Sequence, residues 1–305
     1  MVSEGMQRVI NLLKKFQESL KGTLTVEAIR NGLDQLAAMT KLPKDVKCEL
    51  IDVGGVSAEW VSTPNAVENH VILYLHGGGW VAGSINTHRG LVARISRSSK
   101  ARVLIIDYRL APEHPFPAGL DDCITAYKWL LSKGIKSENI VIAGDSAGGN
   151  LTLASLIKLR DDGITLPVAA VCLSPGTDAT LSSESFKTKA EIDPFLTQEG
   201  IELMRSQYIE DKDRKNPLVS PLFADLQGLP PLLIHVGSSE ILLDDSVRFA
   251  KRAKEAGVDV TLEIWEDMIH VFHAFAEWSP ESQQAIEKVA EFIQKHIKKE
   301  HLVAD

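Results

Sequence analysis

Cysteine is scarce in this chain of 305 residues, and no disulfide framework is expected. The three cysteines, Cys48, Cys123 and Cys172, are odd in number and lie far apart. Cys172 stands in an apolar run, where a reduced thiol behaves as a small buried hydrophobic side chain. A chain without disulfides favours a reducing compartment.

Positive charge is also in short supply. The chain carries 33 Lys and Arg against 41 Asp and Glu, for a formal net charge of -8. An acidic surface repels the phosphate backbone of DNA and RNA. We therefore expect no nucleic-acid partner.

No long hydrophobic run is present. Crossing a bilayer takes about 18 or more consecutive apolar residues, and no stretch approaches that length. The first twenty residues place Glu4, Arg8 and Lys14 among the apolar ones, so they lack the uninterrupted core of a signal peptide. The expectation is a cytoplasmic protein without a stable membrane anchor.

The chain does have enough apolar residues, 44%, for one large α/β domain with an accessory element. It begins with two helical patterns, ending near Pro43. Thr25 is the expected N-cap of the second helix, which runs towards Met39. The first has an apolar stripe made by Met6, Val9, Leu13, Phe16 and Leu20.

From residue 48 onward the pattern changes to short β-branched runs. Several are apolar on both faces and are separated by helical patterns such as 120–131 and 147–160, which is typical of a mostly parallel sheet covered by helices. The first two are joined by Gly54 and Gly55 and predict an antiparallel hairpin. The eight predicted strands are 48–53, 58–63, 71–76, 102–108, 140–144, 168–174, 232–236 and 261–265.

One interval, between Pro175 and Pro230, contains no clear strand. Thr197 is placed to cap a helix there, and a helical insertion between two core strands is typical of a lid. At the end of the chain Ser279 and Pro280 predict the start of a last helix. We expect cap helices in 1–45, a catalytic core in 46–180 and 216–305, and a cap insertion in 181–215, all within a single domain.

The sharpest motif is Gly144-Asp145-Ser146-Ala147-Gly148, which follows an apolar strand and precedes a helical pattern. An abrupt strand-to-helix turn projects the serine hydroxyl above the sheet, and small flanking residues avoid collisions there. Gly-x-Ser-x-Gly also occurs as a plain glycine-rich turn. The flanking strand and helix favour a nucleophile at Ser146.

A second motif, His76-Gly77-Gly78-Gly79-Trp80, follows the strand at 71–76. Consecutive glycines let backbone N–H groups approach a developing oxyanion closely. A phosphate-binding loop would place Lys and Ser or Thr directly after the glycines, and Trp80 follows instead. We therefore expect Gly78 and Gly79, together with Ala147, to form an oxyanion hole.

A serine nucleophile needs a base, and His270 is the candidate, because it follows the last strand by a short polar link at the same sheet edge as Ser146. His273, one helical turn onward, is the rival. His235 lies within an apolar strand and is expected to be a core histidine, and His76 is expected to organise the glycine loop. The remaining candidates lack a comparable context: His88, His114, His296 and His301.

The third member must orient the imidazole and stabilise it when it is charged. Glu240 lies in the loop after the strand at 232–236, whereas Asp244 and Asp245 suit the first turn of the next helix. Taking Glu240 as the acid gives the chain order Ser, acid, His of α/β-hydrolases.

Together these segments closely resemble the hormone-sensitive-lipase-like family of α/β-hydrolase esterases, known for an HGGG motif and a GDSAGG motif. The resemblance covers roughly residues 70 to 275, about two-thirds of the chain. The segments that carry it are His76–Trp80, DYRLAPEHPFPA at 107–118, GDSAGGN at 144–150, Ser220-Pro221-Leu222 and His270-Val271-Phe272.

The resemblance implies an α/β-hydrolase fold with a helical cap and hydrolysis of short- to medium-chain acyl esters, without a metal or organic cofactor. Ser146, Glu240 and His270 fall on the family's triad, and Gly78, Gly79 and Ala147 fall on its oxyanion hole. The chain departs from the family where many members carry Asp-Pro-Leu and it carries Glu240-Ile241-Leu242. The extra methylene of Glu shifts the carboxylate relative to that of Asp.

Two other functions are considered. A true lipase would act at lipid interfaces, but the first helix has a small basic face and the chain is acidic. A ligand-binding receptor on this fold would lack the triad histidine, and His270 is present. Amide, lactone and peptide hydrolysis remain open.

Two further expectations concern binding. Trp80, Phe195, Met204 and Tyr208 are candidate pocket residues, although such side chains more often pack in a core. The strand at 261–265 is a candidate edge for homodimerisation.

Overall fold

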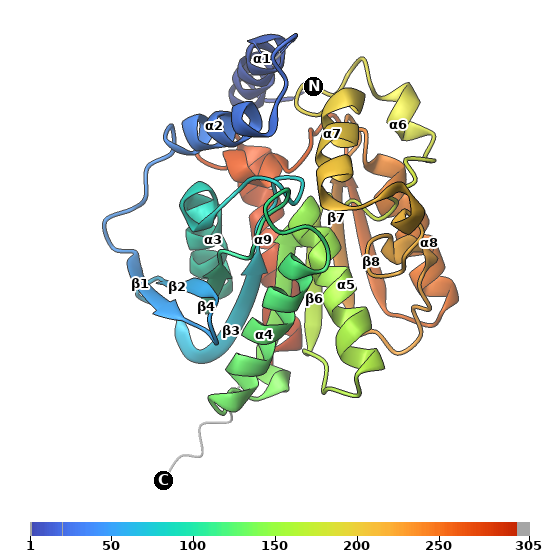
Figure 1. Ribbon diagram of the computed structural model, residues 1–305. Coiled ribbons are helices and arrows are strands. Elements are labelled where there is room, and N and C mark those ends of the chain that lie inside the picture. The colour runs from blue at the N-terminus through green and yellow to red at the C-terminus, as the bar shows by residue number, and fades with distance from the viewer. Residues whose placement is uncertain (1, 20, 298–305) are drawn as a thin grey trace.

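The computed structural model describes residues 2–19 and 21–297 (Figure 1). Leu20, His301 and residues 298–305 of the predicted core lie outside the described residues. Within the described part an eight-stranded sheet stands between two layers of helices, and further helices lie above one edge of the sheet. This is the α/β-hydrolase fold that the sequence predicts.

The sheet has the strand order β1-β2-β4-β3-β5-β6-β7-β8. Only β2 runs opposite to the other seven strands. Its antiparallel pairing with β1 confirms the predicted hairpin of the first two strands. The strands are β1 (Lys47–Asp52), β2 (Ser57–Ser62), β3 (Val67–Leu75), β4 (Ala101–Ile106), β5 (Ile140–Asp145), β6 (Ala169–Leu173), β7 (Leu232–Gly237) and β8 (Val260–Trp265).

All eight predicted strands are present, and β3 differs most from its prediction. It begins at Val67, four residues before the predicted start at Val71, and its pairing with β4 shifts register between these two residues. The added residues are exposed or half-buried and include Glu68 and Asn69, so they show no apolar pattern. The inner part of β3 and all of β5, β6 and β7 are buried, as expected for parallel strands covered on both faces.

Helices α3 and α9 pack on one face of the sheet, and α4, α5 and α8 pack on the other (Figure 1). The helices are α1 (Glu4–Ser19), α2 (Val26–Ala37), α3 (Ile85–Ser99), α4 (Ala118–Ser132), α5 (Ala147–Asp161), α6 (Ser185–Thr188), α7 (Gln198–Tyr208), α8 (Leu243–Glu255) and α9 (Pro280–His296). Short 3-10 turns occupy Ser137–Asn139, Asp211–Asp213, Pro221–Phe223 and Phe272–Phe275.

The predicted helix starts are confirmed by their capping hydrogen bonds. The side chains of Thr25, Thr197 and Ser279 accept from backbone N–H groups in the first turns of α2, α7 and α9. In α1 the predicted apolar stripe is buried at Met6, Val9 and Leu13. These local features fix where the outer helices begin.

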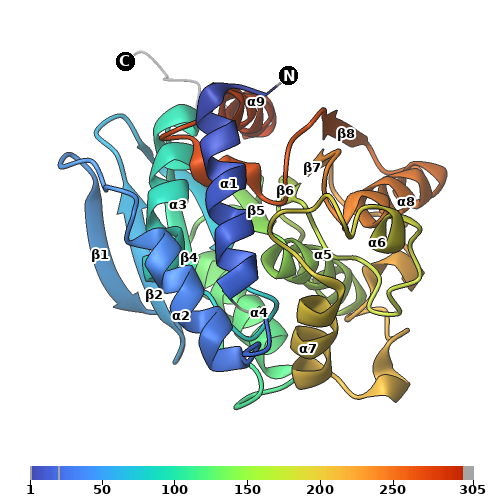
Figure 2. The ribbon, with the colours of Figure 1, turned by 90° about the horizontal axis from the view of Figure 1, so that it is seen from above.

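The carboxyl edge of the sheet is covered from two distant parts of the chain. Seen from above, α1 and α2 lie beside α7 over this edge (Figure 2). We call residues 181–215, which include α6 and α7, the insert segment. The division into cap and core stays a prediction. Among the helices of the described residues, none combines the length and apolar character needed to cross a bilayer.

Candidate active site

Ser146 occupies the turn between β5 and α5, with φ +51° and ψ −117°. A non-glycine residue is strained at this φ. Neighbouring backbone packs closely against both sides of the turn. A Cβ added at Gly148 would lie 1.9 Å from the carbonyl oxygen of Leu75, and one at Gly144 would lie 2.4 Å from that of Gly148. The predicted glycines are therefore required by packing, and the hydroxyl of Ser146 faces the space above the sheet.

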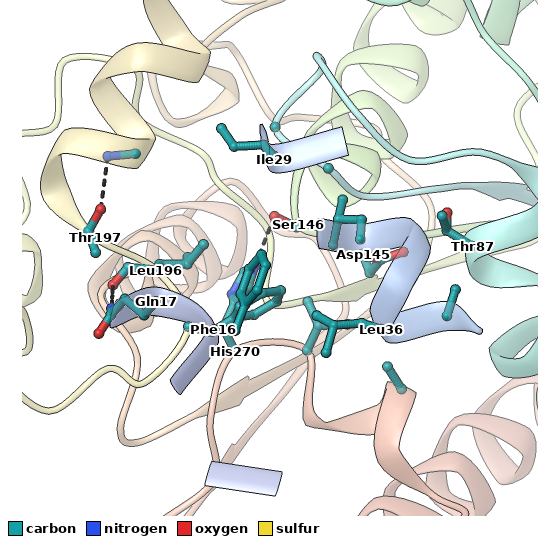
Figure 3. A pocket seen from close by; sticks show the side chains of 18 of the residues that line it. Phe16, Gln17, Ile29, Leu36, Thr87, Asp145, Ser146, Leu196, Thr197 and His270 are labelled. Carbon is teal, nitrogen blue, oxygen red and sulfur yellow. Dashed lines mark hydrogen bonds between the residues drawn. The ribbon is translucent and has the colours of Figure 1, made fainter. Parts of the chain in front are cut away.

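A chain of hydrogen bonds joins the three residues predicted as nucleophile, base and acid. Nε2 of His270 lies 2.9 Å from Oγ of Ser146 (Figure 3), and Nδ1 of His270 lies 2.6 Å from Oε2 of Glu240. Because a carboxylate only accepts, Nδ1–H donates to Glu240 and leaves Nε2 free to accept the serine proton. The loops after β5, β7 and β8 bring these residues to one edge of the sheet.

The carboxylate of Glu240 is fully buried and bonded through both oxygens. Its Oε1 accepts from N–H of Gly237 at 2.6 Å and from Oγ of Ser174 at 2.8 Å. Ser174 in turn accepts from N–H of Val271, next to His270, at 3.2 Å. Glutamate thus reaches the histidine in spite of the departure from the family pattern, while Ser174 ties the acid loop to the histidine loop.

The alternative candidates for the base and the acid form hydrogen bonds with other partners. His273 is buried, and its Nε2 lies 3.1 Å from Nδ1 of His235, which confirms His235 as a hydrogen-bonded core residue. Asp244 and Asp245 stand in the first turn of α8, as predicted. Their carboxylates accept from backbone N–H groups of the segment that follows β6.

The electrostatics of the site favour a charged imidazole at position 270. Burial acts to lower the pKa of His270, but the negative charge of Glu240 and its hydrogen bond raise it, and the net pKa lies above the ordinary value. In contrast, burial lowers the pKa of His235 to about 3 and that of His273 well below its usual range. Of these three histidines, only His270 is placed to take up a proton.

The glycine loop after β3 borders the site. Gly78 and Gly79 take φ +118° and +62°, and a Cβ on Gly79 would lie 2.1 Å from Sδ of Met204. Both glycines border the same cavity as Ser146 and His270, and Ala147 borders an adjoining smaller pocket with Ser146. Each of the three predicted oxyanion donors therefore borders a space that Ser146 also borders.

Two buried side chains hold this loop. Oδ1 of Asp145 accepts from N–H of Gly77 at 3.1 Å and from the hydroxyl of Tyr74 at 2.8 Å. His76 donates from Nδ1 to the carbonyl oxygen of Gly77 at 2.8 Å and stacks on Tyr108. His76 thus organises the loop as predicted, whereas the role of Asp145 was not anticipated.

A cavity of about 680 Å³ opens above Ser146. Side chains of α1, α2 and the insert segment line it together with the loops of the sheet edge (Figure 3). Phe195 and Met204 border it as predicted, but Phe16 and Leu36 of the N-terminal helices were not foreseen as lining residues. The apolar spacing of Phe16 predicted only packing, and no motif marked Leu36.

A second pocket of about 50 Å³ meets the cavity at the serine. The two share only Gly79, Ser146, Leu196 and Met204. Trp80 lines this small pocket, whereas Tyr208 borders neither space and stacks on Trp80 with ring centroids 4.6 Å apart. Of the candidate pocket residues, Tyr208 is therefore a packed residue, which forms the layer behind Trp80.

Sequence reasoning also missed Asp193 and Gln17. Asp193, in the insert segment, accepts from N–H of Ile241, the residue after Glu240, at 2.9 Å. Gln17 of α1 donates to the carbonyl oxygens of Asp193 and Leu196 at 3.3 Å. Within the described residues, no cluster of three or more His, Cys, Asp or Glu side chains is arranged to hold a metal ion.

Comparison with known proteins agrees with this architecture. A family model described as the alpha/beta hydrolase fold matches residues 72–274. An esterase of Acinetobacter venetianus is 39% identical over 270 residues, 88% of this chain and 89% of the relative. An acetyl-hydrolase of Streptomyces hygroscopicus is 41% identical over 245 residues, covering 80% of this chain and 82% of the relative.

Solved structures are similar over almost the whole chain. A crystal structure of an esterase from the bacterial hormone-sensitive lipase family is 45% identical, with a TM-score of 0.94 over 98% of this chain and 100% of that one. An esterase/lipase from an uncultured bacterium is 47% identical, with a TM-score of 0.90 over 96% and 99% of the two chains. This chain belongs to the hormone-sensitive-lipase-like family of α/β-hydrolase esterases and is a serine carboxylic-ester hydrolase.

Proposed function

We propose that Ser146, His270 and Glu240 form the catalytic triad of a carboxylesterase and that Gly78, Gly79 and Ala147 form its oxyanion hole. The hydrogen bonds of 2.9 Å and 2.6 Å that run from the serine through the histidine to the glutamate carry the proposal. This order of groups activates a serine for attack on an acyl carbon.

In the first half-reaction, His270 takes the hydroxyl proton of Ser146 as Oγ attacks the ester carbonyl. The N–H groups of the oxyanion hole stabilise the negative charge on the former carbonyl oxygen. The protonated His270 then gives its proton to the leaving alkoxide, and an acyl-enzyme remains. Water, deprotonated by the same histidine, then attacks the acyl carbon. The bond between that carbon and Oγ breaks, His270 returns its proton to Ser146, and the acid is released.

The two cavities suggest which half of the ester each one takes. The leaving alkoxide must receive its proton from His270, and His270 borders the large cavity but not the small pocket. We therefore assign the alcohol to the cavity of about 680 Å³ and the acyl chain to the pocket of about 50 Å³. The small pocket has room for an acyl chain of only a few carbons, which favours short-chain esters.

The residues above the sheet edge support a related proposal. Phe16 and Leu36 from the N-terminal helices and Leu196 from the insert segment close the cavity over Ser146 (Figure 3). We propose that 1–45 and 181–215 act as the cap that holds the alcohol and excludes water. No step of this mechanism uses a metal or an organic cofactor.

A series of p-nitrophenyl esters tests the function. We expect kcat/KM to be highest with acetate or butyrate, to fall at octanoate and to be lowest at dodecanoate. Ser146→Ala should lose at least about 10³-fold in kcat while its unfolding curve stays that of the wild type. Wild-type turnover in this variant would refute the proposed nucleophile. A preference for dodecanoate with activation at lipid interfaces would indicate a lipase.

A matched pair of variants tests the assignment of the two cavities. Leu242 borders only the small pocket, and Leu36 borders only the large cavity. Leu242→Ala should move the preferred acyl chain towards octanoate, whereas Leu36→Ala should leave the acyl preference unchanged. The opposite pattern would reverse the assignment.

A further inference from the structure

Asp193 lies where the insert segment meets the loop of the proposed triad acid. It stands between α6 and α7, and its side chain is buried. Its Oδ1 accepts from the N–H groups of Phe195 and Leu196, both at 2.9 Å. Its Oδ2 accepts from N–H of Ile241 at 2.9 Å. One carboxylate oxygen therefore shapes the insert segment, and the other crosses to a residue 48 positions away.

The peptide groups of Ile241 are held from the insert segment on both sides. Asp193 accepts from its N–H, and the hydroxyl of Ser185 donates to its carbonyl oxygen at 2.7 Å. Ile241 directly follows Glu240 and is itself fully buried. The backbone that carries the triad acid is thus fixed by the segment above it as well as by the sheet below.

The same turn places side chains against the substrate cavity. Phe195 and Leu196 border the cavity, and the ring of Phe195 lies 6.1 Å from that of His270. Gln17 of α1 donates to the carbonyl oxygens on either side of this turn (Figure 3 shows its bond to Leu196). Asp193 is therefore the point where α1, the insert segment and the acid loop are joined.

The negative charge of Asp193 also acts on the pKa of His270. The titratable groups that face His270 are Glu240 on the loop after β7, Asp193 on the insert segment, Asp145 at the end of β5, and His273 on its own loop. After Glu240, Asp193 is the next charge that raises the pKa of His270. Burial raises the pKa of Asp193 itself to about 6, against the lowering effect of His270 and three backbone donors.

We propose that Asp193 is a positioning residue of this esterase, which holds the loop of Glu240 in register with His270 and adds its negative charge to the site. The assignment rests on the proposed function, because it acts through Glu240 and His270. It makes the insert segment part of the machinery that orients the base, in addition to a wall of the substrate cavity.

The variant Asp193→Asn tests the bond to Ile241 and the charge of Asp193 while it keeps the bonds within the insert segment. An asparagine oxygen can still accept from Phe195 and Leu196, but its NH₂ group then faces the N–H of Ile241, so the crossing bond and the charge are both lost. With p-nitrophenyl acetate we expect kcat to fall about 10-fold or more, with KM changed by less. The acidic limb of the kcat/KM profile should move to lower pH, because His270 loses a neighbouring negative charge.

Asp244→Asn is the matched control. Asp244 also ties the insert segment to this region, since its carboxylate accepts from N–H of Ser185 at 2.7 Å, but it has no bond to Ile241. We expect Asp244→Asn to keep the wild-type acidic limb and most of kcat. If both variants lose kcat equally and neither moves the acidic limb, Asp193 is only a structural anchor and the proposal is overturned.

Asp193→Glu keeps the test decisive if the asparagine variant does not fold. Glutamate retains the charge but misplaces the oxygens, so kcat should fall while the acidic limb stays near that of the wild type. Wild-type kcat in a folded Asp193→Glu or Asp193→Asn variant would overturn the assignment. Ser146→Ala is measured alongside. Its inactivity with full activity of the Asp193 variants refutes the role of Asp193 alone, whereas an active Ser146→Ala refutes the proposed function and this role with it.

Discussion

The two oxygens of the Glu240 carboxylate have different hydrogen-bond partners. Oε2 faces His270, and Oε1 is bound by Gly237 and Ser174. Both oxygens of the buried group therefore accept hydrogen bonds, and each of the three partners is a donor. A neutral amide in its place must turn its NH₂ group towards one of these donors.

We therefore expect Glu240→Gln to lower kcat by about 10² to 10⁴-fold, because the amide cannot stabilise the imidazolium that forms during catalysis. Its remaining activity should show an acidic limb at lower pH, since the charge of Glu240 raises the pKa of His270. A pH series of kcat/KM with p-nitrophenyl acetate measures both effects. Glu240→Asp keeps the charge and should be the more active of the two. Activity of Glu240→Gln within a few-fold of the wild type would contradict the assignment.

The sequence predicted the three proposed triad residues but not the residues that hold them in place. Ser146 and His270 stand out because a motif and a strand end place them. Glu240 follows from its position after β7. Asp193 and Ser174 reach the site only through contacts between residues far apart in the chain, and no periodicity or motif marks either side chain.

Among the elements, the first turn of α8 contains a buried aspartate whose pKa affects the stability of the fold. Asp245 is buried, and its Oδ2 accepts from the N–H groups of Thr177 and Asp178 at 2.7 and 2.9 Å. Burial raises its pKa to about 7, and the nearby charge of Asp178 adds to this against the two backbone donors. The folded pKa therefore lies well above the value of about 3.9 in an unfolded chain.

The sign of the effect on stability follows from this difference. A group with a raised folded pKa favours the native state while it is protonated, and that contribution is lost as the pH rises from about 4 to about 7. Asp245→Asn keeps an oxygen for both backbone donors and removes the charge. We expect its free energy of unfolding, relative to the wild type, to increase between pH 5 and pH 8 by about 1 to 3 kcal/mol. Urea unfolding at both pH values measures it, and an unchanged difference between the two proteins would count against the raised pKa.

How well an element could be predicted depended on how much of it is buried. The inner strands are buried throughout and were found in the sequence, as were α2, α7 and α9, each of which begins after a capping threonine or serine. The outer start of β3 is exposed, and α6 has only four residues, so neither has a pattern to recognise. The insert segment was foreseen as helical, but its bonds to the acid loop depend on tertiary contacts alone.

For the whole molecule, one edge of the sheet bears on assembly. Strand β8 pairs with β7 along one side and is the last strand of the sheet, and Ile264 on it is 49% exposed. An exposed edge with apolar side chains can pair with the same edge of a second copy. We therefore keep the prediction of a homodimer formed through β8.

Light scattering on the eluting protein at micromolar concentration tests this prediction. The wild type should elute as a dimer, and Ile264→Lys should elute as a monomer, because a charged side chain replaces an exposed apolar one on the pairing edge. Leu50→Lys, at an exposed site on the opposite edge strand β1, is the control and should remain dimeric. A monomeric wild type, or a dimeric Ile264→Lys variant, would rule out this interface.

The two unequal spaces that meet at Ser146 also have a practical consequence. Because they share only four lining residues, most positions in either lining can be changed without altering the other. With the proposed assignment of acyl chain and alcohol to the two spaces, a directed-evolution library for this scaffold can be divided in two, one half screened on the acid and the other on the alcohol. The best variants of each half are then suited to combination, since effects at separate, non-contacting sites usually add.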